Sequence, residues 1–201
     1  MRILTATVII VLLLVSQVSA IQRVVDNWDY GIKSGIAISD FYNCDDCIKD
    51  SKMGFTGGIF AEYQASDYFS IQPELLVVMK GWETSGNNIN LNYLELPILF
   101  KVKIPTSGNV TPNFYVGPAG ALMVSAKAEG YDVSELFQEI DYGIAIGAGA
   151  DLEAGSGKVV FDVRYTLGLK AIPDNEILWG FPDDVPDIKN RALSFSVGFG
   201  W

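Results

Sequence analysis

The last nine residues of the chain alternate between large apolar and small side chains without a break. Leu193, Phe195, Val197, Phe199 and Trp201 occupy the odd positions, and serine or glycine occupies each position between them. Period-two alternation predicts a strand with one bulky apolar face and one small face. Such a terminal strand would invite aggregation in a soluble sheet. A transmembrane barrel, in contrast, needs lipid on one side of this strand and a narrow lumen on the other.

The same alternation recurs in seven earlier segments, so eight strands are predicted. They are expected at residues 29–39, 54–64, 69–80, 91–103, 113–125, 140–153, 158–170 and 191–201. Each is long enough for a tilted membrane strand, which requires about 9–11 residues. Long connections are expected at residues 41–53, 82–90, 126–139 and 171–190, and they alternate with short turns. The pattern predicts an all-β fold, an eight-stranded antiparallel up-and-down transmembrane β-barrel.

Three prolines, Pro73, Pro97 and Pro118, stand inside the predicted strands. Proline lacks the N–H group that a ladder hydrogen bond uses, and a closed barrel has no edge strand to accommodate it. These residues are therefore expected at bulges or near the rims of the barrel.

The beginning of the chain has the features of a signal peptide. Arg2 supplies a positive start, residues 8–15 form a short apolar run, and Val18-Ser19-Ala20 supplies the small residues of a cleavage site. No later stretch approaches the roughly 20 apolar residues of a spanning helix, so membrane insertion is expected through strands. The expected organisation is a cleaved signal peptide at 1–20, a short N-terminal segment at 21–28 and an outer membrane β-barrel domain at 29–201.

Composition narrows the classes of partner and chemistry. The chain has 14 basic and 24 acidic residues, a formal net charge of −10, and no histidine. The acidic balance argues against nucleic acid and against anionic headgroups bound by a general basic face. The absence of histidine argues against lipases of the serine–histidine type and against imidazole-bound metals. We therefore expect no enzymatic activity and no cofactor.

Charged residues collect on the small-residue face, which becomes the lumen of the predicted barrel. The expected lumen charge network consists of Lys33, Glu62, Glu74, Lys80, Glu95, Lys101, Asp162 and Arg164. An eight-stranded barrel is filled by its own side chains, and charges buried there must pair. The favoured interpretation is a structural plug of salt bridges. The alternatives are a proton or ion path and acid–base catalysis by paired carboxylates.

The first long connection contains Cys44-Asp45-Asp46-Cys47. In an exported protein, this spacing favours a small disulfide between Cys44 and Cys47. Free or metal-binding thiols and a redox centre are the alternatives, although a thioredoxin-like centre would require a βαβ unit. The first and last long connections are also rich in acidic residues, which form either a solvated surface or oxygen ligands for Ca²⁺ or Mg²⁺ bridging to lipopolysaccharide.

Several short motifs occur in a characteristic order. They include Gly57-Gly58-Ile59-Phe60, Ile71-Gln72-Pro73-Glu74-Leu75, Tyr93-Leu94-Glu95-Leu96-Pro97-Ile98-Leu99 and Gly117-Pro118-Ala119-Gly120. In this order they resemble the PorT-type outer membrane protein β-barrel domain family over nearly the whole mature chain. The resemblance implies an eight-stranded barrel of the outer membrane but no particular activity. The member that gives the family its name is associated with protein secretion across the outer membrane.

Outer membrane barrels typically present a terminal aromatic residue to their assembly machinery. Phe199 and Trp201 are therefore the expected membrane assembly signal. The expected partners are outer membrane lipid, the barrel assembly machinery and a periplasmic or secretion partner protein.

Three functions remain open at this point. The first is a small non-enzymatic outer membrane barrel with a plugged lumen and a structural or surface-interaction role. The second is an accessory component of protein secretion. The third is a soluble periplasmic ligand-binding barrel, which would need an apolar interior. The membrane interpretation therefore fails if Phe161, Val163 and Tyr165 point inward.

Overall fold

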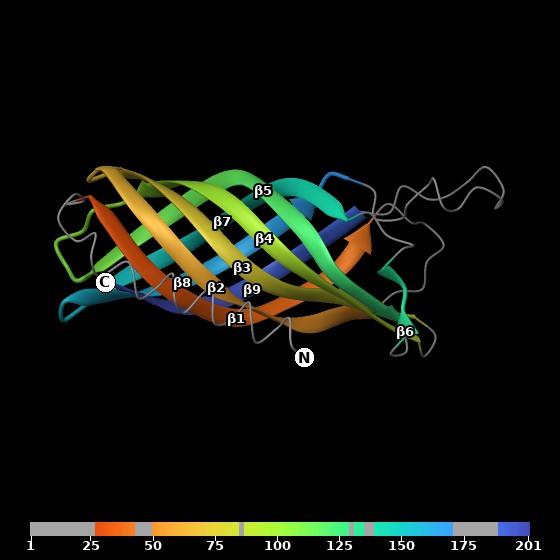
Figure 1. The fold of residues 1–201 in the computed structure, drawn as a ribbon. Helices are drawn as coiled ribbons and strands as arrows, with labels where there is room; N and C mark the ends of the chain where they lie inside the picture. The colour runs from red at the N-terminus through yellow and green to blue at the C-terminus, as the bar shows by residue number, and fades with distance from the viewer. Residues whose placement is uncertain (1–26, 43–49, 85–86, 129–130, 135–138, 171–188) are drawn as a thin grey trace, which may run out of the picture.

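The computed structural model describes residues 27–42, 50–84, 87–128, 131–134, 139–170 and 189–201. The strands are β1 (Trp28–Tyr42), β2 (Asp50–Ser66), β3 (Phe69–Thr84), β4 (Asn87–Lys103), β5 (Val110–Ala128), β6 (Tyr131–Asp132), β7 (Ile140–Ala154), β8 (Gly157–Gly168) and β9 (Lys189–Gly200). The order β4-β3-β2-β1-β9-β8-β7-β5, with β4 also pairing β5, closes eight strands into the predicted barrel (Figure 1). No helix in these ranges has the length and apolarity needed to cross a membrane.

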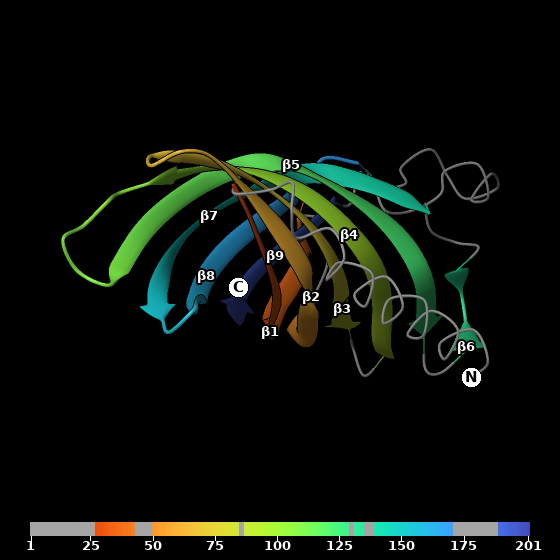
Figure 2. The ribbon, with the colours of Figure 1, turned by 60° about the vertical axis from the view of Figure 1, so that its left-hand side comes forward.

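The two ends of the barrel differ. Short turns join β2 to β3, β4 to β5 and β7 to β8 at one end of the barrel, which we call the turn end. The C-terminus of the chain lies at the same end (Figure 1). The opposite end, which we call the loop end, carries the two-residue strand β6 beside β5. A second view shows the strands tilted and coiled around the barrel axis (Figure 2).

The terminal strand closes the barrel. β9 pairs with β1 from Gly31 and Gly200 onward, and with β8 on its other side. The backbone of Trp201 extends this closure, because it accepts a hydrogen bond from the Tyr30 N–H at 3.2 Å and donates one to the Tyr30 carbonyl at 2.9 Å. The Phe199 and Trp201 rings stack outside the wall with their centres 6.5 Å apart. Backbone hydrogen bonding to β1 therefore continues one residue beyond the end of β9.

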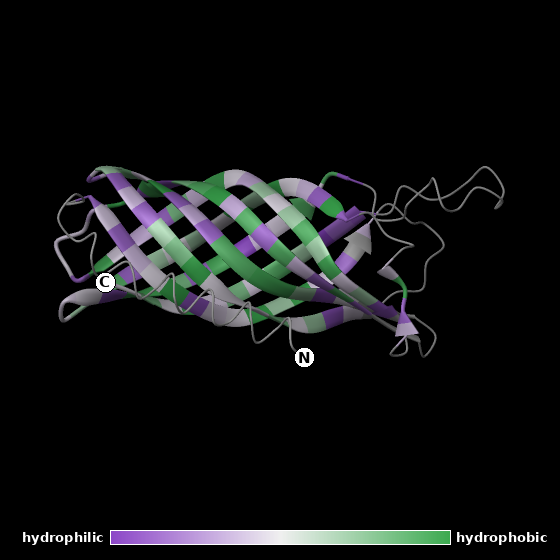
Figure 3. Cartoon of the chain, viewed as in Figure 1, coloured by the Kyte–Doolittle hydropathy of each residue, from purple (hydrophilic) through white to green (hydrophobic). Residues whose placement is uncertain are grey.

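The apolar faces of the strands point away from the lumen. Phe161, Val163 and Tyr165 are 46, 43 and 37% exposed, whereas the residues between them in β8 are buried. Polar and apolar residues alternate along neighbouring strands around the wall (Figure 3). This is the orientation that a lipid-facing wall requires, and it is opposite to the apolar interior of a soluble ligand-binding barrel.

An aromatic group marks the turn end of the outer wall. Trp28 packs against Tyr30 and Tyr63, with ring centres 6.4 and 5.2 Å apart. Aromatic residues of this kind favour the level of the lipid headgroups. Trp201 lies at the same end, so this group agrees with an interfacial girdle.

The prediction of a long connection at residues 82–90 is wrong. β3 and β4 stay paired as far as Thr84 and Asn87, so only residues 85–86 separate the two strands. Glycine and asparagine in this segment are turn formers, but a backbone ladder needs no apolar side chains and can continue through polar residues. Every barrel strand except β8 is longer than predicted, and the observed lengths are 12–19 residues. The expected strict alternation of long and short connections does not hold.

The prolines do not occupy bulges or rims. None of the register shifts in the sheet involves a proline. Instead, the ladder between β3 and β4 is interrupted after Pro73, and the ladder between β4 and β5 is interrupted after Pro97. Pro118 lies within the second interruption. The missing N–H donors therefore coincide with short unpaired stretches inside the wall.

Candidate functional site

The inward face of the barrel carries buried charge. The eight residues of the lumen charge network come from β1, β2, β3, β4 and β8, and each is 8% exposed or less. Period-two geometry explains their common direction, because residues two apart in a strand point to the same side. These residues and their neighbours form three groups along the barrel, which we call the central, turn-end and loop-end clusters.

The central cluster consists of Lys33, Glu74, Asp162 and Arg164. The Arg164 guanidinium contacts both oxygens of Glu74, with Nη1–Oε2 at 2.8 Å and Nη2–Oε1 at 3.0 Å. Lys33 Nζ lies 2.7 Å from Glu74 Oε1 and 3.6 Å from Asp162 Oδ1. A two-pronged guanidinium–carboxylate contact is among the stronger charge-assisted hydrogen bonds. Two cations and two carboxylates balance in this cluster.

Neutral groups complete the central cluster. The Tyr115 hydroxyl donates to Asp162 Oδ2 at 2.5 Å, and the Gln72 amide donates to Glu74 Oε1 at 2.6 Å. The Arg164 guanidinium also lies 5.4 Å from the centre of the Tyr115 ring. These contacts supply the additional hydrogen bonds that buried ions need if their desolvation is to be offset.

The turn-end cluster gathers three lysines around Glu62, whose side chain is completely buried. Lys103 Nζ lies 2.7 Å and Lys101 Nζ 3.5 Å from Glu62 Oε1, and Lys158 Nζ lies 2.6 Å from Glu62 Oε2. The Ser70 hydroxyl donates to Glu62 Oε1 at 2.6 Å. The carboxylates of Asp29 and Asp151, which also contact Lys158, bring the cluster to charge balance.

Four charged members of the turn-end cluster are absent from the predicted network, namely Asp29, Asp151, Lys103 and Lys158. Lys103 and Lys158 lie at the turn-end limits of β4 and β8, and both fall inside the strands predicted at 91–103 and 158–170. The alternation nevertheless contained the signal. Lys103 has the same parity as Lys101, and Lys158 has the same parity as Asp162.

The loop-end cluster consists of Lys80, Glu95 and Asp141, with Tyr93 and Asn190 beside them. Lys80 forms an ion pair with Glu95, and its ammonium lies 5.1 Å from the centre of the Tyr93 ring. The Asn190 amide donates to Asp141 Oδ2 at 3.3 Å and to the Tyr93 hydroxyl at 3.2 Å. One cation therefore faces two carboxylates, so this cluster is not balanced.

Small and apolar side chains fill much of the remaining lumen. Ala37, Leu76 and Val78 form one buried group, and a second consists of Leu99, Tyr115, Ala119 and Ala145. Among the described residues, two of the cavities beside the clusters each have a volume of about 10 Å³. A cavity of this size holds about one water molecule.

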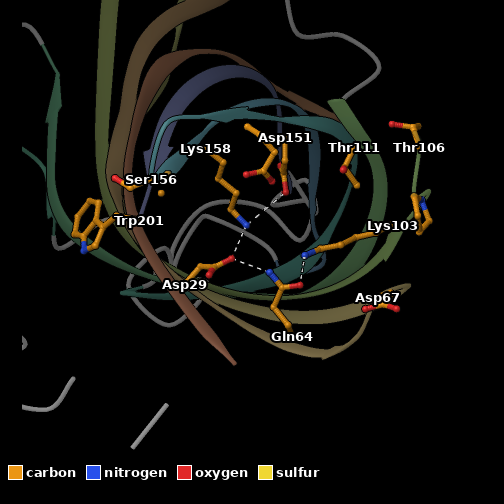
Figure 4. A pocket seen from close by; sticks show the side chains of 14 residues that line it. Asp29, Gln64, Asp67, Lys103, Thr106, Thr111, Asp151, Ser156, Lys158 and Trp201 are labelled. Atoms are coloured by element: carbon orange, nitrogen blue, oxygen red, sulfur yellow. Dashed lines mark hydrogen bonds and ion pairs between the residues drawn. The ribbon is translucent and has the colours of Figure 1, made fainter. Parts of the chain in front are cut away.

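A larger hollow opens at the turn end, which we call the vestibule (Figure 4). Its volume is about 380 Å³. A hydrogen-bonded chain crosses it: Lys158 donates to Asp29 at 2.8 Å, Gln64 donates to Asp29 at 2.7 Å, and Lys103 donates to Gln64 at 2.9 Å. Asp67 and Glu153 contribute exposed carboxylates at its rim.

The carboxylates of the central and turn-end clusters are already engaged in ion pairs. The chain has no histidine to serve as a base. Across the described ranges, no three side chains of the Asp, Glu or Cys type come together as metal ligands. The carboxylates of the central and turn-end clusters contact lysine or arginine rather than each other. These ion pairs connect side chains from strands that lie on different sides of the barrel wall.

The predicted disulfide lies outside the described residues, because Cys44 and Cys47 fall in the segment 43–49. We expect thiol labelling of the non-reduced, denatured protein to modify neither cysteine, and labelling after reduction to modify both. Reduction should change barrel stability little, because the stabilising effect of a disulfide grows with the length of the loop it closes. Two labelled cysteines in the non-reduced sample would contradict the prediction.

Comparison with known families supports the fold and its setting. The family model described as "Outer membrane protein beta-barrel domain" matches residues 16–173. A comparison with curated protein sequences finds no match.

Solved structures of similar fold include several outer membrane barrels. Neisserial surface protein A has a TM-score of 0.54 at 14% identity, with 84% of this chain and 95% of that chain covered. OprG from Pseudomonas aeruginosa has a TM-score of 0.54 at 14% identity, with 87 and 95% covered. The outer membrane enzyme PagL has a TM-score of 0.51 at 12% identity, with 84 and 97% covered. At these identities the similarity establishes the fold alone.

Proposed function

Because the chain belongs to the outer membrane protein β-barrel domain family, we propose that it is a small non-enzymatic barrel whose lumen is plugged by its own side chains. Its role is structural or lies in surface interactions. It is exported with the signal peptide at residues 1–20, which is then removed. In the outer membrane its turn end faces the periplasm, since short turns lie on that side in bacterial barrels.

The observation that carries this proposal is the charge pairing across the lumen. Glu74 on β3 forms ion pairs with Lys33 on β1 and with Arg164 on β8, so charged side chains span the interior at its centre. An eight-stranded barrel has an interior just wide enough for side chains. Paired ions of opposite sign in so narrow a space leave no continuous path for solutes.

Planar-bilayer recording of the refolded protein tests the plug. We expect no steady channels of a single conductance, because the central cluster and the apolar side chains beside it close the lumen. A porin inserted into the same bilayers serves as the positive control. Steady, single-sized openings from the wild-type barrel would overturn the proposal and make transport the leading function.

The proposed partners follow from the outer surface and the chain terminus. The exposed apolar wall fits outer membrane lipid, and Phe199 and Trp201 serve as the signal for the barrel assembly machinery. This role is supported by the exposure of both side chains, of which Phe199 lies on the closing strand β9 and Trp201 directly follows it.

A role as an accessory component of protein secretion is the second candidate. The PorT-type resemblance suggests it, and the vestibule favours it, because a polar hollow of about 380 Å³ is available to a periplasmic partner. A photocrosslinker at Ser156, in the turn beside the vestibule, should then capture a protein in intact cells. The same crosslinker at Val163 on the lipid-facing wall is the matched control. Equal labelling from both positions would argue against a partner at the turn end.

A further inference from the structure

The loop-end cluster carries one negative charge more than it can neutralise. Lys80 from β3 is paired with Glu95 from β4, and Asp141 from β7 faces the same space. Among the described residues that line this space, β5 contributes Ala119 and Ala121 and β8 contributes Thr166 and Gly168, and none of these side chains is charged. Leaving an isolated carboxylate charge in the interior of a protein is costly unless a partner compensates it.

The excess charge is aimed into a cavity. Asp141 is 8% exposed, and its Oδ1 atom has no hydrogen-bond partner among the described residues. The cavity beside it has a volume of about 10 Å³ and is lined by Lys80, Glu95 and Thr166 as well. Ala121 lies opposite Glu95 on one side and opposite Asp141 on the other. Its small side chain leaves room between the two carboxylates.

We propose that the loop-end cluster binds one small monovalent metal cation between Asp141 and Glu95. Oxygen atoms are the ligands that hard cations prefer, and the carboxylates and the Thr166 hydroxyl supply them. The charge balance selects a monovalent ion, because one positive charge neutralises the cluster and two would leave it positive. The volume selects a small ion, because the cavity admits about one water-sized body. This ion site is independent of the scaffold and secretion roles.

The test compares thermal unfolding of the refolded full-length barrel in sodium chloride and in N-methyl-D-glucamine chloride at the same ionic strength. The organic cation is too large for the cavity. We expect the unfolding midpoint to be higher in sodium, by about 3–6 °C when sodium is present at about ten times its dissociation constant. Caesium should stabilise less than sodium, because it is the larger ion.

Two variants should abolish the difference between the salts. Asp141→Asn and Glu95→Gln each remove the excess charge while keeping the side-chain shape. Asp151→Asn is the matched control and should retain the difference, because this carboxylate belongs to the balanced turn-end cluster. The proposal is overturned if the wild-type midpoint is the same in both salts, or if Asp141→Asn keeps the shift. A proton would neutralise the same charge. Stability that falls with rising pH equally in both salts would therefore overturn the metal site as well.

Discussion

Replacing Glu62 with glutamine is expected to lower the free energy of unfolding of the barrel by about 3–5 kcal/mol, the usual cost of removing one partner from a buried ion pair. Glu62 is fully buried and contacts the ammonium groups of Lys101, Lys103 and Lys158. Glutamine keeps the shape and some hydrogen bonding but not the charge. Three ammonium groups would then share only the carboxylates of Asp29 and Asp151, so the cluster would hold an uncompensated positive charge.

A urea titration of protein refolded into lipid vesicles measures this cost, with tryptophan fluorescence as the signal. Asp67→Asn is the matched control, because it removes a carboxylate from the exposed turn between β2 and β3. Its effect should stay within about 0.5 kcal/mol. The double variant Glu62→Gln/Lys103→Gln restores charge balance and should be more stable than Glu62→Gln alone. A loss from Glu62→Gln as small as that from Asp67→Asn would show that the turn-end cluster does not hold the barrel together.

Much of the barrel could be predicted from the sequence because its two environments are so different. Lipid and a narrow polar lumen impose opposite requirements on neighbouring residues, so the alternation from Lys158 to Leu169 assigned both faces of β8 correctly. The limits of the ladders were harder to predict. Beyond the alternating segment, pairing depends on backbone hydrogen bonds that any residue can make, and β3 and β4 therefore extend through the polar stretch at 82–90.

The partners within the lumen could not be predicted in the same way. Alternation shows that Lys33, Glu74 and Arg164 face inward, but they lie on β1, β3 and β8. Which of them meet depends on the stagger of the strands around the closed barrel, and strand register is not encoded in the period. The charge excess at the loop end is a consequence of the same stagger. It brings Asp141 beside a lysine that Glu95 already engages.

The substitution Val163→Lys is expected to lower the free energy of unfolding of the barrel in a bilayer by about 2–4 kcal/mol, because a charged side chain on the lipid-facing wall near the membrane midplane is strongly destabilising. Val163 is 43% exposed on the outer wall and lies level with Phe195 of β9. Phe195 in turn lies opposite Ile36 of β1, so three strands present apolar side chains at this depth. A lysine there must either lose its hydration or deform the lipid around it.

Depth provides the control for this prediction. Val159 lies on the same face of β8, four residues closer to the turn end and level with Phe199. A lysine at 159 can extend its ammonium into the headgroup layer. Val159→Lys should therefore lower the free energy of unfolding by only about 0–1 kcal/mol. Val163→Ala separates the loss of apolar contact from the cost of the charge. The measurement is urea unfolding of each variant in vesicles. Equal stabilities of the two lysine variants would contradict a lipid-facing position for Val163, since only a hydrophobic environment graded with depth distinguishes these two sites.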